Sequence, residues 1–398
     1  MGGLILELSD LLKRAEELKQ QLSIWRRDFH TNPELGYQEL RTAAKVEEHL
    51  KRLGLEVETG VGKTGVTGLL RGQEPGPTIG IRADMDALPI QDEKEVTYRS
   101  SNANVAHLCG HDAHTSILMG AAELFTSLGK PKKGNIKFIF QPAEELLAGA
   151  AAMIADGVLE NPKVDAIIGL HVNPSLRVGE IGITYGVVCA SVDNISIKII
   201  GKGGHGARPH EGKDSILIAS QVIVALQNIS SRMIDPLEPV VVSIGKINGG
   251  TIGTAIATSV EMEGTVRTLS PAIREKIPQL MEQVIKGVVS AFDADYEFSY
   301  ELNYPSLENN KDLIDLVSET SAEILGAEQC KLLNASTGGE DFSFYAEQIP
   351  GAFFRLGVGN GSLETSYPLH HPSFDLDEEG LYYGVAMLTG TALKYLEN

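Results

Sequence analysis

The chain has few cysteines, and their number argues against a disulfide framework. Only Cys109, Cys189 and Cys330 occur among its 398 residues. An odd and sparse set of cysteines is typical of proteins from a reducing compartment. The N-terminal stretch MGGLILELSDLLKRAEELKQ also lacks the basic start and apolar centre of a secretion signal. We therefore expect a cytoplasmic protein.

Basic tracts and long apolar runs are missing as well. The chain has 34 basic and 53 acidic side chains, which give a formal net charge of −19. No cluster of Lys and Arg stands out, so we expect neither a nucleic-acid partner nor binding to an anionic membrane surface. No run of about 18 apolar residues is present, so we expect no membrane-spanning segment. The hydrophobic fraction of 42% excludes global disorder.

The first half of the chain alternates helical and strand-like patterns. Helical spacing of apolar residues opens the chain at 3–30 and returns at 38–53. Buried strands are predicted within 78–90, 135–145 and 164–172, with helices between them. Such alternation indicates an α/β layer with a parallel-rich, mixed sheet.

The pattern changes near residue 190. Strands and helices then follow in the order β-α-β-β-α-β up to residue 304, which is a complete ferredoxin-like unit. Helix and strand alternate again after this unit, and a final helix starts at about 377. At about 150 residues per domain the length allows two or three domains. We predict two: a discontinuous α/β domain of residues 1–189 and 305–398, and an inserted α+β domain of residues 190–304.

Metal-binding residue types follow several predicted strands. Cys109 and His111 are separated by one glycine, and a thiolate and an imidazole at this spacing can bind one metal ion. Ligands gather at the carboxyl ends of strands in α/β folds. The other candidates at such ends are Asp84, Asp86, Glu144, Glu145, His171, His370 and His371. Five segments with this property predict a metal centre, although a nucleophilic Cys109 paired with a histidine is an alternative.

The adjacent acids Glu144 and Glu145 could have two different roles. Adjacent side chains after a strand can point in different directions. One carboxylate can then bind metal while the other takes a proton from a metal-activated water. A solvated helix start is the simpler alternative, because acids there suit the helix dipole.

These segments, in this order, resemble peptidase family M20, and specifically its amidohydrolase branch. That branch includes aminoacylases, hippurate hydrolases and plant indole-acetyl amino acid hydrolases. The resemblance covers essentially the whole chain, and CGHDAHT together with PAEE is its most specific part. The matching segments are RRDFHTNPELGYQE (26–39), RADMDALPI (82–90), HLCGHDAHT (107–115), QPAEE (141–145), GLHV (169–172), GKGGHGARPH (201–210), GTVRT (264–268), GGEDF (338–342) and LHHPSFD (369–375).

The resemblance implies a di-metal catalytic domain with an inserted lid domain that mediates homodimer formation. Glu144 would be the general base, and the metal ions would be Zn²⁺ or Mn²⁺, with Co²⁺ or Ni²⁺ as further options. The implied metal ligands are Cys109, His111, Glu145, His171 and His370.

One stretch departs from the wider family, which has His-x-Asp where this chain has Asp84-Met-Asp86. The histidine ligand is absent here, and we expect His111 to take its place. Asp86 would then orient a ligand without touching the metal. We expect supporting roles for His107 and His114.

The resemblance also implies substrate contacts. His205 would polarise the scissile carbonyl, commonly in the partner subunit's site. Arg267 would receive a substrate carboxylate, although an ordinary surface ion pair is an equal alternative. Gly338 is a third predicted contact. Thr254, in GGTIGTAIA (249–257), stands where the family usually has Asn, so the substrate of no single family member can be carried over.

We therefore predict a hydrolase that cleaves the amide bond of N-acyl amino acids. A carboxypeptidase or dipeptidase with the same metal site is the nearest alternative, and its substrate would be a short peptide. A non-catalytic metal-binding protein on the same fold is an alternative of another class. A cysteine hydrolase would differ from all of these because alkylation, and not chelation, would stop it.

Overall fold

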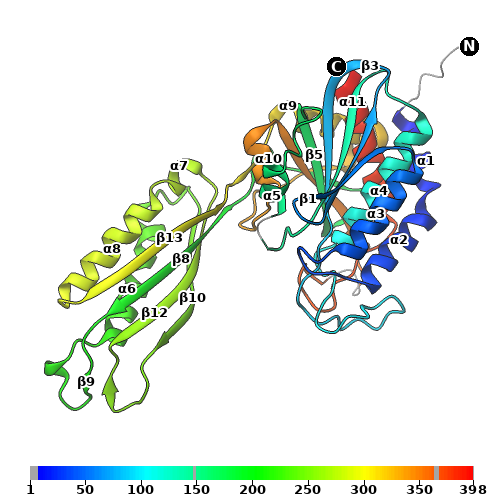
Figure 1. Cartoon of the computed structure of the whole chain (residues 1–398). Helices are drawn as coiled ribbons and strands as arrows, with labels where there is room; N and C mark the ends of the chain where they lie inside the picture. Colours follow the sequence, from blue (N-terminus) through cyan, green and yellow to red (C-terminus); the bar gives the residue numbers. More distant parts are fainter. Residues whose placement is uncertain (1–7, 147–148, 363–366, 398) are drawn as a thin grey trace, which may run out of the picture. The chain divides into compact units, whose positions relative to one another are not determined.

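The computed structural model describes residues 8–146, 149–362 and 367–397, and the chain forms two compact units (Figure 1). The second unit comprises Cys189–Leu307 and Ala335–Glu340, and the first comprises the rest. The sequence analysis places 335–340 with the first domain. The structure groups it with the second, because Ala190 N donates hydrogen bonds to Ser336 O and Gly338 O at 3.1 and 3.0 Å.

A mixed, mostly parallel sheet of eight strands forms the centre of the first unit. Its order is β1-β2-β4-β3-β5-β16-β6-β15. The central strands β4, β3, β5 and β16 run parallel to their neighbours in this group, so their carboxyl ends meet at one edge. The strands are β1 (Glu56–Val61), β2 (Gly65–Arg71), β3 (Glu74–Asp84), β4 (Lys133–Gln141), β5 (Ala166–Arg177), β6 (Ile181–Ile183), β15 (Cys330–Leu332) and β16 (Gly351–Gly359); two short strands, β7 (Gly186–Cys189) and β14 (Leu307–Asn309), pair separately.

Helices cover both faces of this sheet. Helices α4 and α11 pack on one face with α3 and α9 beside them, and α1 and α2 pack outside α11 and α4. Helices α5 and α10 pack on each other and on the sheet. The helices are α1 (Leu8–Glu16), α2 (Lys19–Thr31), α3 (Leu40–Arg52), α4 (His111–Leu128), α5 (Gly149–Ala155), α9 (Lys311–Ile324), α10 (Ser343–Gln348) and α11 (Gly380–Glu397), with a short 3₁₀ turn η3 (Ala327–Gln329).

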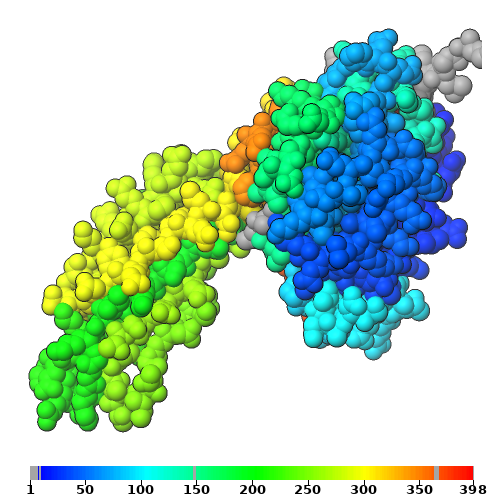
Figure 2. Space-filling view, in the orientation of Figure 1, coloured from blue at the N-terminus to red at the C-terminus, as the bar shows by residue number. Residues whose placement is uncertain are grey.

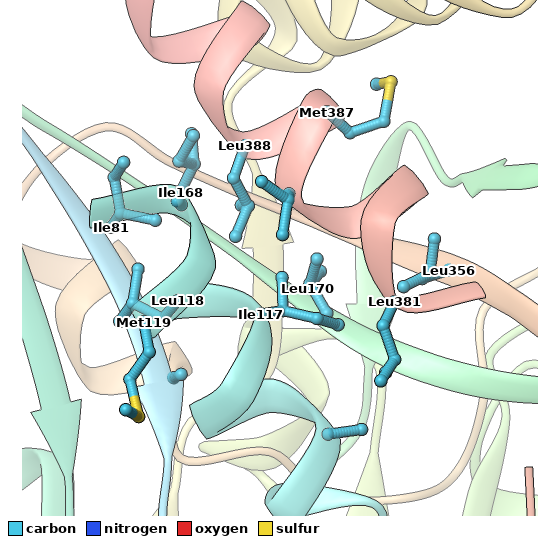
Figure 3. Packing of buried hydrophobic residues seen from close by; sticks show 14 of the residues in the cluster. Ile81, Ile117, Leu118, Met119, Ile168, Leu170, Leu356, Leu381, Met387 and Leu388 are labelled. Carbon is cyan, nitrogen blue, oxygen red and sulfur yellow. The ribbon is translucent and has the colours of Figure 1, made fainter. Parts of the chain in front are cut away.

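The main core lies between α4, α11 and the sheet. Figure 3 shows Ile117 of α4 near Leu381 of α11, and Leu388 of α11 near Ile168 of β5; Leu118 of α4 belongs to the same cluster. All five side chains are at most 1% exposed. This packing fixes the start of α4, which carries the metal-type residues, against the sheet.

Two expectations about this unit were wrong. The predicted helix over 3–30 is two helices, because a turn at Glu17 and Leu18 separates α1 from α2; residues 3–7 lie outside the described part. The hairpin of β1 and β2 was not predicted. Its strands include Gly60, Gly65 and Gly68, which weaken the strand signal.

The second unit is a four-stranded antiparallel sheet with two helices on one face, which confirms the ferredoxin-like prediction. The sheet order is β10-β12-β8-β13. Ile195, Ile197 and Ile199 of β8 are buried against the helices, while Lys198 and Ser196 alternate with them. The elements are β8 (Ser191–Ile200), β9 (Gly204–His205), η1 (Pro209–Glu211), α6 (Ser215–Asn228), η2 (Ile229–Met233), β10 (Val240–Gly249), β11 (Ala255–Ile256), β12 (Ser259–Thr268), α7 (Pro271–Arg274), α8 (Ile277–Ala291) and β13 (Asp295–Tyr304).

One described helical stretch, Ser215–Met233, is long and apolar enough by composition to cross a membrane. One such helix is weak evidence, because the apolar face of α6 also packs on the sheet of the second unit through Ile218, Val222 and Leu226. Figure 2 shows the N-terminal helices, in blue, on the surface of the first unit, as expected for an outer layer.

Candidate metal centre

The loop before α4 brings a thiol and an imidazole to the carboxyl edge of the sheet. Gly110 separates Cys109 from His111 and has a φ of +88°, which L-residues with side chains rarely adopt. A Cβ at this position would lie 2.3 Å from Val172 Cγ2, so the loop also passes too close to β5 for any side chain. Only glycine therefore permits this approach.

The six residues predicted as metal ligands or base lie together in the first unit. Their ligand atoms form three overlapping groups, and within each group all atoms lie within 4.8 Å of one another. The groups are Cys109–His111–His171, Cys109–Glu145–His370 and His111–Glu144–Glu145. Because the groups share members, the six side chains lie around one region of the first unit.

Two buried atoms in this region make no hydrogen bond to any residue that the structure describes. They are His111 Nε2 and Glu145 Oε1. A buried polar atom without a partner is costly, and such atoms in native structures call for a ligand or an ion. The donor set of thiolate, imidazole and carboxylate is the one that divalent transition metals prefer. The residues therefore fit a metal centre.

Hydrogen bonds fix the tautomers of two histidines in the form that binds metal. His111 Nδ1 lies 2.9 Å from Asp86 O and 3.2 Å from Asp86 Oδ1, so this nitrogen carries the proton. His171 Nδ1 lies 2.8 Å from Val172 O and is protonated for the same reason. Nε2 is therefore the nitrogen that each ring has available for a metal, and that of His171 lies 3.4 Å from Cys109 Sγ.

Asp86 does more than orient His111. Its second carboxylate oxygen, Oδ2, accepts a hydrogen bond from Glu145 N at 3.0 Å. One aspartate therefore positions two of the predicted ligands, His111 through its ring and Glu145 through its backbone. The geometry suits the orienting role predicted for Asp86, because no metal contact is needed for it.

His370 reaches the site with a backbone conformation that is unusual for a residue with a side chain. Its φ is +68°, and its backbone N donates to Leu108 O at 2.7 Å. His370 Nε2 lies 3.4 Å from Glu145 Oε1. Strained backbone of this kind persists where a function requires it. Ala143, directly before Glu144, is a second case, with a φ of +53°.

The PAEE loop is held from outside by a buried acid. Glu39 Oε1 accepts a hydrogen bond from Ala143 N at 2.8 Å, and Glu39 Oε2 accepts one from Thr64 Oγ1 at 2.6 Å. Burial raises the pKa of Glu39. The final residue of the segment RRDFHTNPELGYQE thus supports the strained backbone beside Glu144.

His114 lies beside the centre but has no nitrogen left for a metal. Val172 N donates to His114 Nε2 at 2.9 Å, and His114 Nδ1 lies 2.6 Å from Asp84 Oδ1. Asp84 also accepts from Arg82 Nη1 at 2.6 Å. Both residues therefore belong to the supporting structure.

The acidity of the buried side chains favours metal binding over nucleophilic catalysis by the cysteine. Burial raises the pKa of the Cys109 thiol well above its ordinary value, so without a nearby cation the thiol stays protonated. Burial also lowers the pKa of His171 well below its ordinary value, which keeps the imidazole neutral. Neutral imidazole is the form that binds metal ions.

A buried ion cluster behind α4 was not predicted as part of the site. Arg26 Nε lies 2.9 Å from Asp112 Oδ2, and Arg26 Nη2 lies 2.6 Å from Asp375 Oδ1. His30 Nδ1 lies 2.7 Å from the same Asp112 oxygen. Asp112 follows His111 directly, so the cluster anchors the first turn of α4. The signal in the sequence was a set of charged residues at helix positions that face the core.

A second supporting group explains the GGEDF segment. Asp341 accepts hydrogen bonds from Arg82 Nη2, from Gln141 Nε2 and from Ala150 N, each at 2.8 or 2.9 Å. Asp341 N lies 3.4 Å from Glu144 Oε1, which places its backbone next to the predicted base. The segment thus ties β3, β4 and the start of α5 together around Glu144.

The remaining predicted residues lie in the second unit, in two pairs. His205 is exposed, and its neighbour Gly206 donates its backbone N–H to Thr254 O at 2.8 Å. Ala207 N donates to His205 Nδ1 at 3.0 Å, so His205 Nε2 carries the proton and can act as a donor. Arg267 Nη1 lies 3.3 Å from the carbonyl of Thr337, which precedes the exposed Gly338.

Comparisons with known proteins agree with this fold and site. Residues 80–394 match the model of peptidase family M20/M25/M40. An N-acetylcysteine deacetylase of Bacillus subtilis is 42% identical over 89% of this chain and 92% of its own length. A thermostable carboxypeptidase 2 of Saccharolobus solfataricus is 37% identical over 97% of this chain and 99% of its own.

A solved structure extends the agreement to three dimensions. It is the YXEP protein of Bacillus subtilis, described as a dinuclear metal-binding peptidase of family M20. The TM-score is 0.83 at 38% identity, over 96% of this chain and 99% of that one. A mixed sheet that collects metal ligands at one edge, with an inserted antiparallel domain, defines a metal-dependent hydrolase. The chain belongs to peptidase family M20 and is a metal-dependent enzyme of its amidohydrolase branch.

Proposed function

We propose that this enzyme hydrolyses the amide bond of N-acyl amino acids and releases a carboxylate and a free amino acid. The observation that carries the proposal is the gathering of Cys109, Glu145, His111, His171 and His370 around one region with Glu144 beside them. The similarity to a deacetylase of N-acetylcysteine supports the substrate class. The similarity to a carboxypeptidase keeps peptide hydrolysis as the second candidate.

In this proposal the five ligands hold two divalent ions. The thiolate and imidazoles favour Zn²⁺, and the mixed donor set also suits Mn²⁺, Co²⁺ or Ni²⁺. When bound, the ions polarise the amide carbonyl and the attacking water.

The residues of the chain carry out the proton transfers. Glu144 takes a proton from the water and later gives it to the leaving nitrogen, because its carboxylate lies within the same group as the ligands His111 and Glu145. His205, whose Nε2 carries a proton, stabilises the charge that develops on the carbonyl oxygen. Arg267 and Gly338 of one copy are proposed to contact the amino-acid part of the substrate. Thr254 lies beside His205, so it would reach the same substrate only from the copy that supplies His205.

The second unit cannot deliver both His205 and Arg267 to the same substrate. Arg267 pairs with Val192 at the start of β8, whereas His205 follows the end of that strand, after Ile200. Ten strand residues span about 30 Å, and a compound the size of a dipeptide spans about 7 Å. If both residues act, they act in two different sites. We therefore propose a homodimer in which His205 of one copy completes the site of the other.

The surface of the second unit suits such a dimer. Ile216, Leu217 and Val224 of α6 are 49%, 49% and 67% exposed. Strand β10 is an edge of the sheet, and its Val241 and Ile247 are also exposed. Apolar side chains and an unpaired edge strand favour association. We propose that a second copy of this chain covers this surface, because His205 and Arg267 would then act in two different sites. The cytoplasmic location stays a prediction.

Amine release from matched substrates tests the reaction. The metal-loaded enzyme would be given N-acetyl and N-benzoyl amino acids and, in parallel, dipeptides with a free amino group. We expect chelator-sensitive release from the N-acyl compounds. Release from the dipeptides alone would replace the proposal with the peptidase alternative.

Mixing two inactive variants tests the shared site. His205→Ala and Glu144→Ala each disable both sites of a homodimer. In a mixed dimer one site has an intact Glu144 and receives an intact His205. Co-expressed chains that pair at random should regain about a quarter of the wild-type activity, because half of the dimers are mixed and each has one working site. No recovery in mixed dimers would contradict the sharing of His205.

A further inference from the structure

Leu146 directly follows the predicted ligand Glu145, and the exposure of the two side chains is the reverse of the usual order. The Glu145 side chain is 14% exposed, whereas Leu146 is 56% exposed. A large apolar side chain beside a polar centre gains stability when a ligand covers it. Adjacent Cα atoms are about 3.8 Å apart, so Leu146 lies at the rim of the metal centre.

The side chain of Leu146 packs against the loop that contains Gly36. A Cβ on Gly36 would lie 2.8 Å from Leu146 Cδ1, 2.9 Å from Leu146 Cγ and 3.1 Å from Ala143 Cα. Glycine at 36 therefore lets the leucine side chain lie against the loop backbone. Leu146 thus packs partly on the loop that contains Gly36, next to Glu144 and Glu145 in the chain.

Tyr37 follows Gly36 in the same loop and has a strained backbone. Its φ is +62°, which is rare for an aromatic residue, and Lys63 Nζ lies 3.7 Å from the centre of its ring. Burial and the nearby Asp341, Glu39 and Asp86 raise the pKa of Tyr37, so its phenol is on the side of the supporting carboxylates. A backbone held in this conformation is typical of a ligand contact.

We propose that Leu146 and Tyr37 form the wall that binds the acyl group of the substrate, and that this wall selects apolar acyl chains longer than acetyl. The inference rests on the proposed function. The scissile carbonyl must lie at Glu144, so the chain attached to it passes the residues that flank the PAEE loop. A flexible aliphatic or aromatic acyl group covers the exposed leucine, whereas an acetyl group is too short to do so.

The test is a series of one amino acid with N-acetyl, N-butanoyl and N-hexanoyl groups. For the wild-type enzyme we expect kcat/KM to rise with chain length. Leu146→Gln keeps the size of the side chain and removes its apolar character. We expect it to lower the ratio of hexanoyl to acetyl kcat/KM about tenfold, the range reported for lost apolar contacts in a pocket.

Leu332→Gln is the matched control. Leu332 lies in the edge strand β15 and is 72% exposed, so it resembles Leu146 in exposure and lies on another element. The control should keep the wild-type ratio. An unchanged ratio in Leu146→Gln would overturn the acyl wall while leaving the proposed reaction intact. A wild-type enzyme without activity on any N-acyl compound would overturn the proposed function, and this inference with it.

Discussion

The two units hold their functional residues in opposite ways. In the first unit the histidines and acids of the metal centre are mostly buried, and several of them touch a second polar side chain that fixes them. In the second unit His205 and Thr254 are exposed, and the contacts described for them are with backbone atoms. The difference teaches that groups which must hold charge in a fixed place are built into the core. The groups that we propose to meet the substrate lie on the surface.

The largest expected effect is at the centre of the buried site. Glu144→Gln removes the base and keeps the shape, so we expect kcat/KM to fall about 10³- to 10⁴-fold. The metal content, measured by elemental analysis, should stay at the wild-type level, because Glu144 is not a proposed ligand. Wild-type turnover in this variant would remove Glu144 from the mechanism.

A smaller effect is expected at Asp86, which contacts two of the proposed ligands. Asp86→Asn keeps the size of the side chain but weakens its contacts with His111 Nδ1 and Glu145 N. We expect metal affinity to fall about 10- to 100-fold. Competition with a chromogenic chelator would measure this, and added metal should restore part of the activity. Unchanged affinity would mean that the two backbone segments hold the ligands without Asp86.

A buried arginine in each unit allows a matched test of stability. Arg26 is fully buried between Asp112 and Asp375, whereas the side chain of Arg274, which binds Asp193, is 15% exposed. Arg26→Met removes the guanidinium that neutralises two buried carboxylates, and we expect a loss of about 3–5 kcal/mol in the free energy of unfolding. Arg274→Met should cost less, because Arg274 is part-exposed and neutralises one carboxylate, Asp193. Denaturant titrations at pH 7 would measure both; equal losses would contradict the contrast between the units.

The contribution of Arg26 should depend on pH in a defined direction. Burial alone would raise the pKa of Asp375, but Arg26, Tyr98 and Lys94 outweigh it and lower the pKa. A carboxylate with a lowered pKa stabilises the fold above about pH 4, its unfolded value, and this contribution is lost as the pH falls through the folded value. The difference between wild type and Arg26→Met should therefore be largest near neutral pH and narrow below pH 4. A stability difference that grows as the pH falls below 4 would exclude the ion pair of Arg26 and Asp375 as its source.

The smallest effect is expected on the exposed surface. Thr254→Asn restores the residue type usual in the family. The Thr254 side chain is exposed, and the carbonyl oxygen of Thr254, which accepts from Gly206 N, is kept in the variant. We therefore expect an unchanged free energy of unfolding and a change of only a few-fold in KM. Steady-state kinetics on one N-acyl amino acid would measure it. A large loss of kcat would show that position 254 contributes to the chemistry itself.

The sequence predicted the site better than it predicted the supports. The rule that strand ends converge grouped the proposed ligands with Asp84, Asp86, Glu144 and His371. The choice of ligands within that group came from the resemblance to family M20; the chosen residues are Cys109, His111, Glu145, His171 and His370. The partners of these residues could not be found in this way. An orienting role was predicted for Asp86, but its bond to the backbone N–H of Glu145 was not, nor was the bond from Ala143 N to Glu39, 104 residues away.

The fold was predicted where apolar periodicity was strong, as in the alternating isoleucines of β8. The prediction missed the places where local turns determine where a helix or strand ends. The break between α1 and α2 and the glycine-containing hairpin of β1 and β2 depend on local backbone conformation, which periodicity does not report.

The spread of the proposed ligands along the chain has a consequence for biosynthesis. The first proposed ligand, Cys109, and the last, His370, are roughly 260 residues apart. At about 5–20 residues per second, a ribosome needs about 13–52 s to make the intervening chain. During this time the thiol and His111 are already synthesised, but the centre lacks its last ligand. Metal uptake at the complete centre is therefore a late event, and a nascent chain exposes a partial chelator to whichever ion is most available.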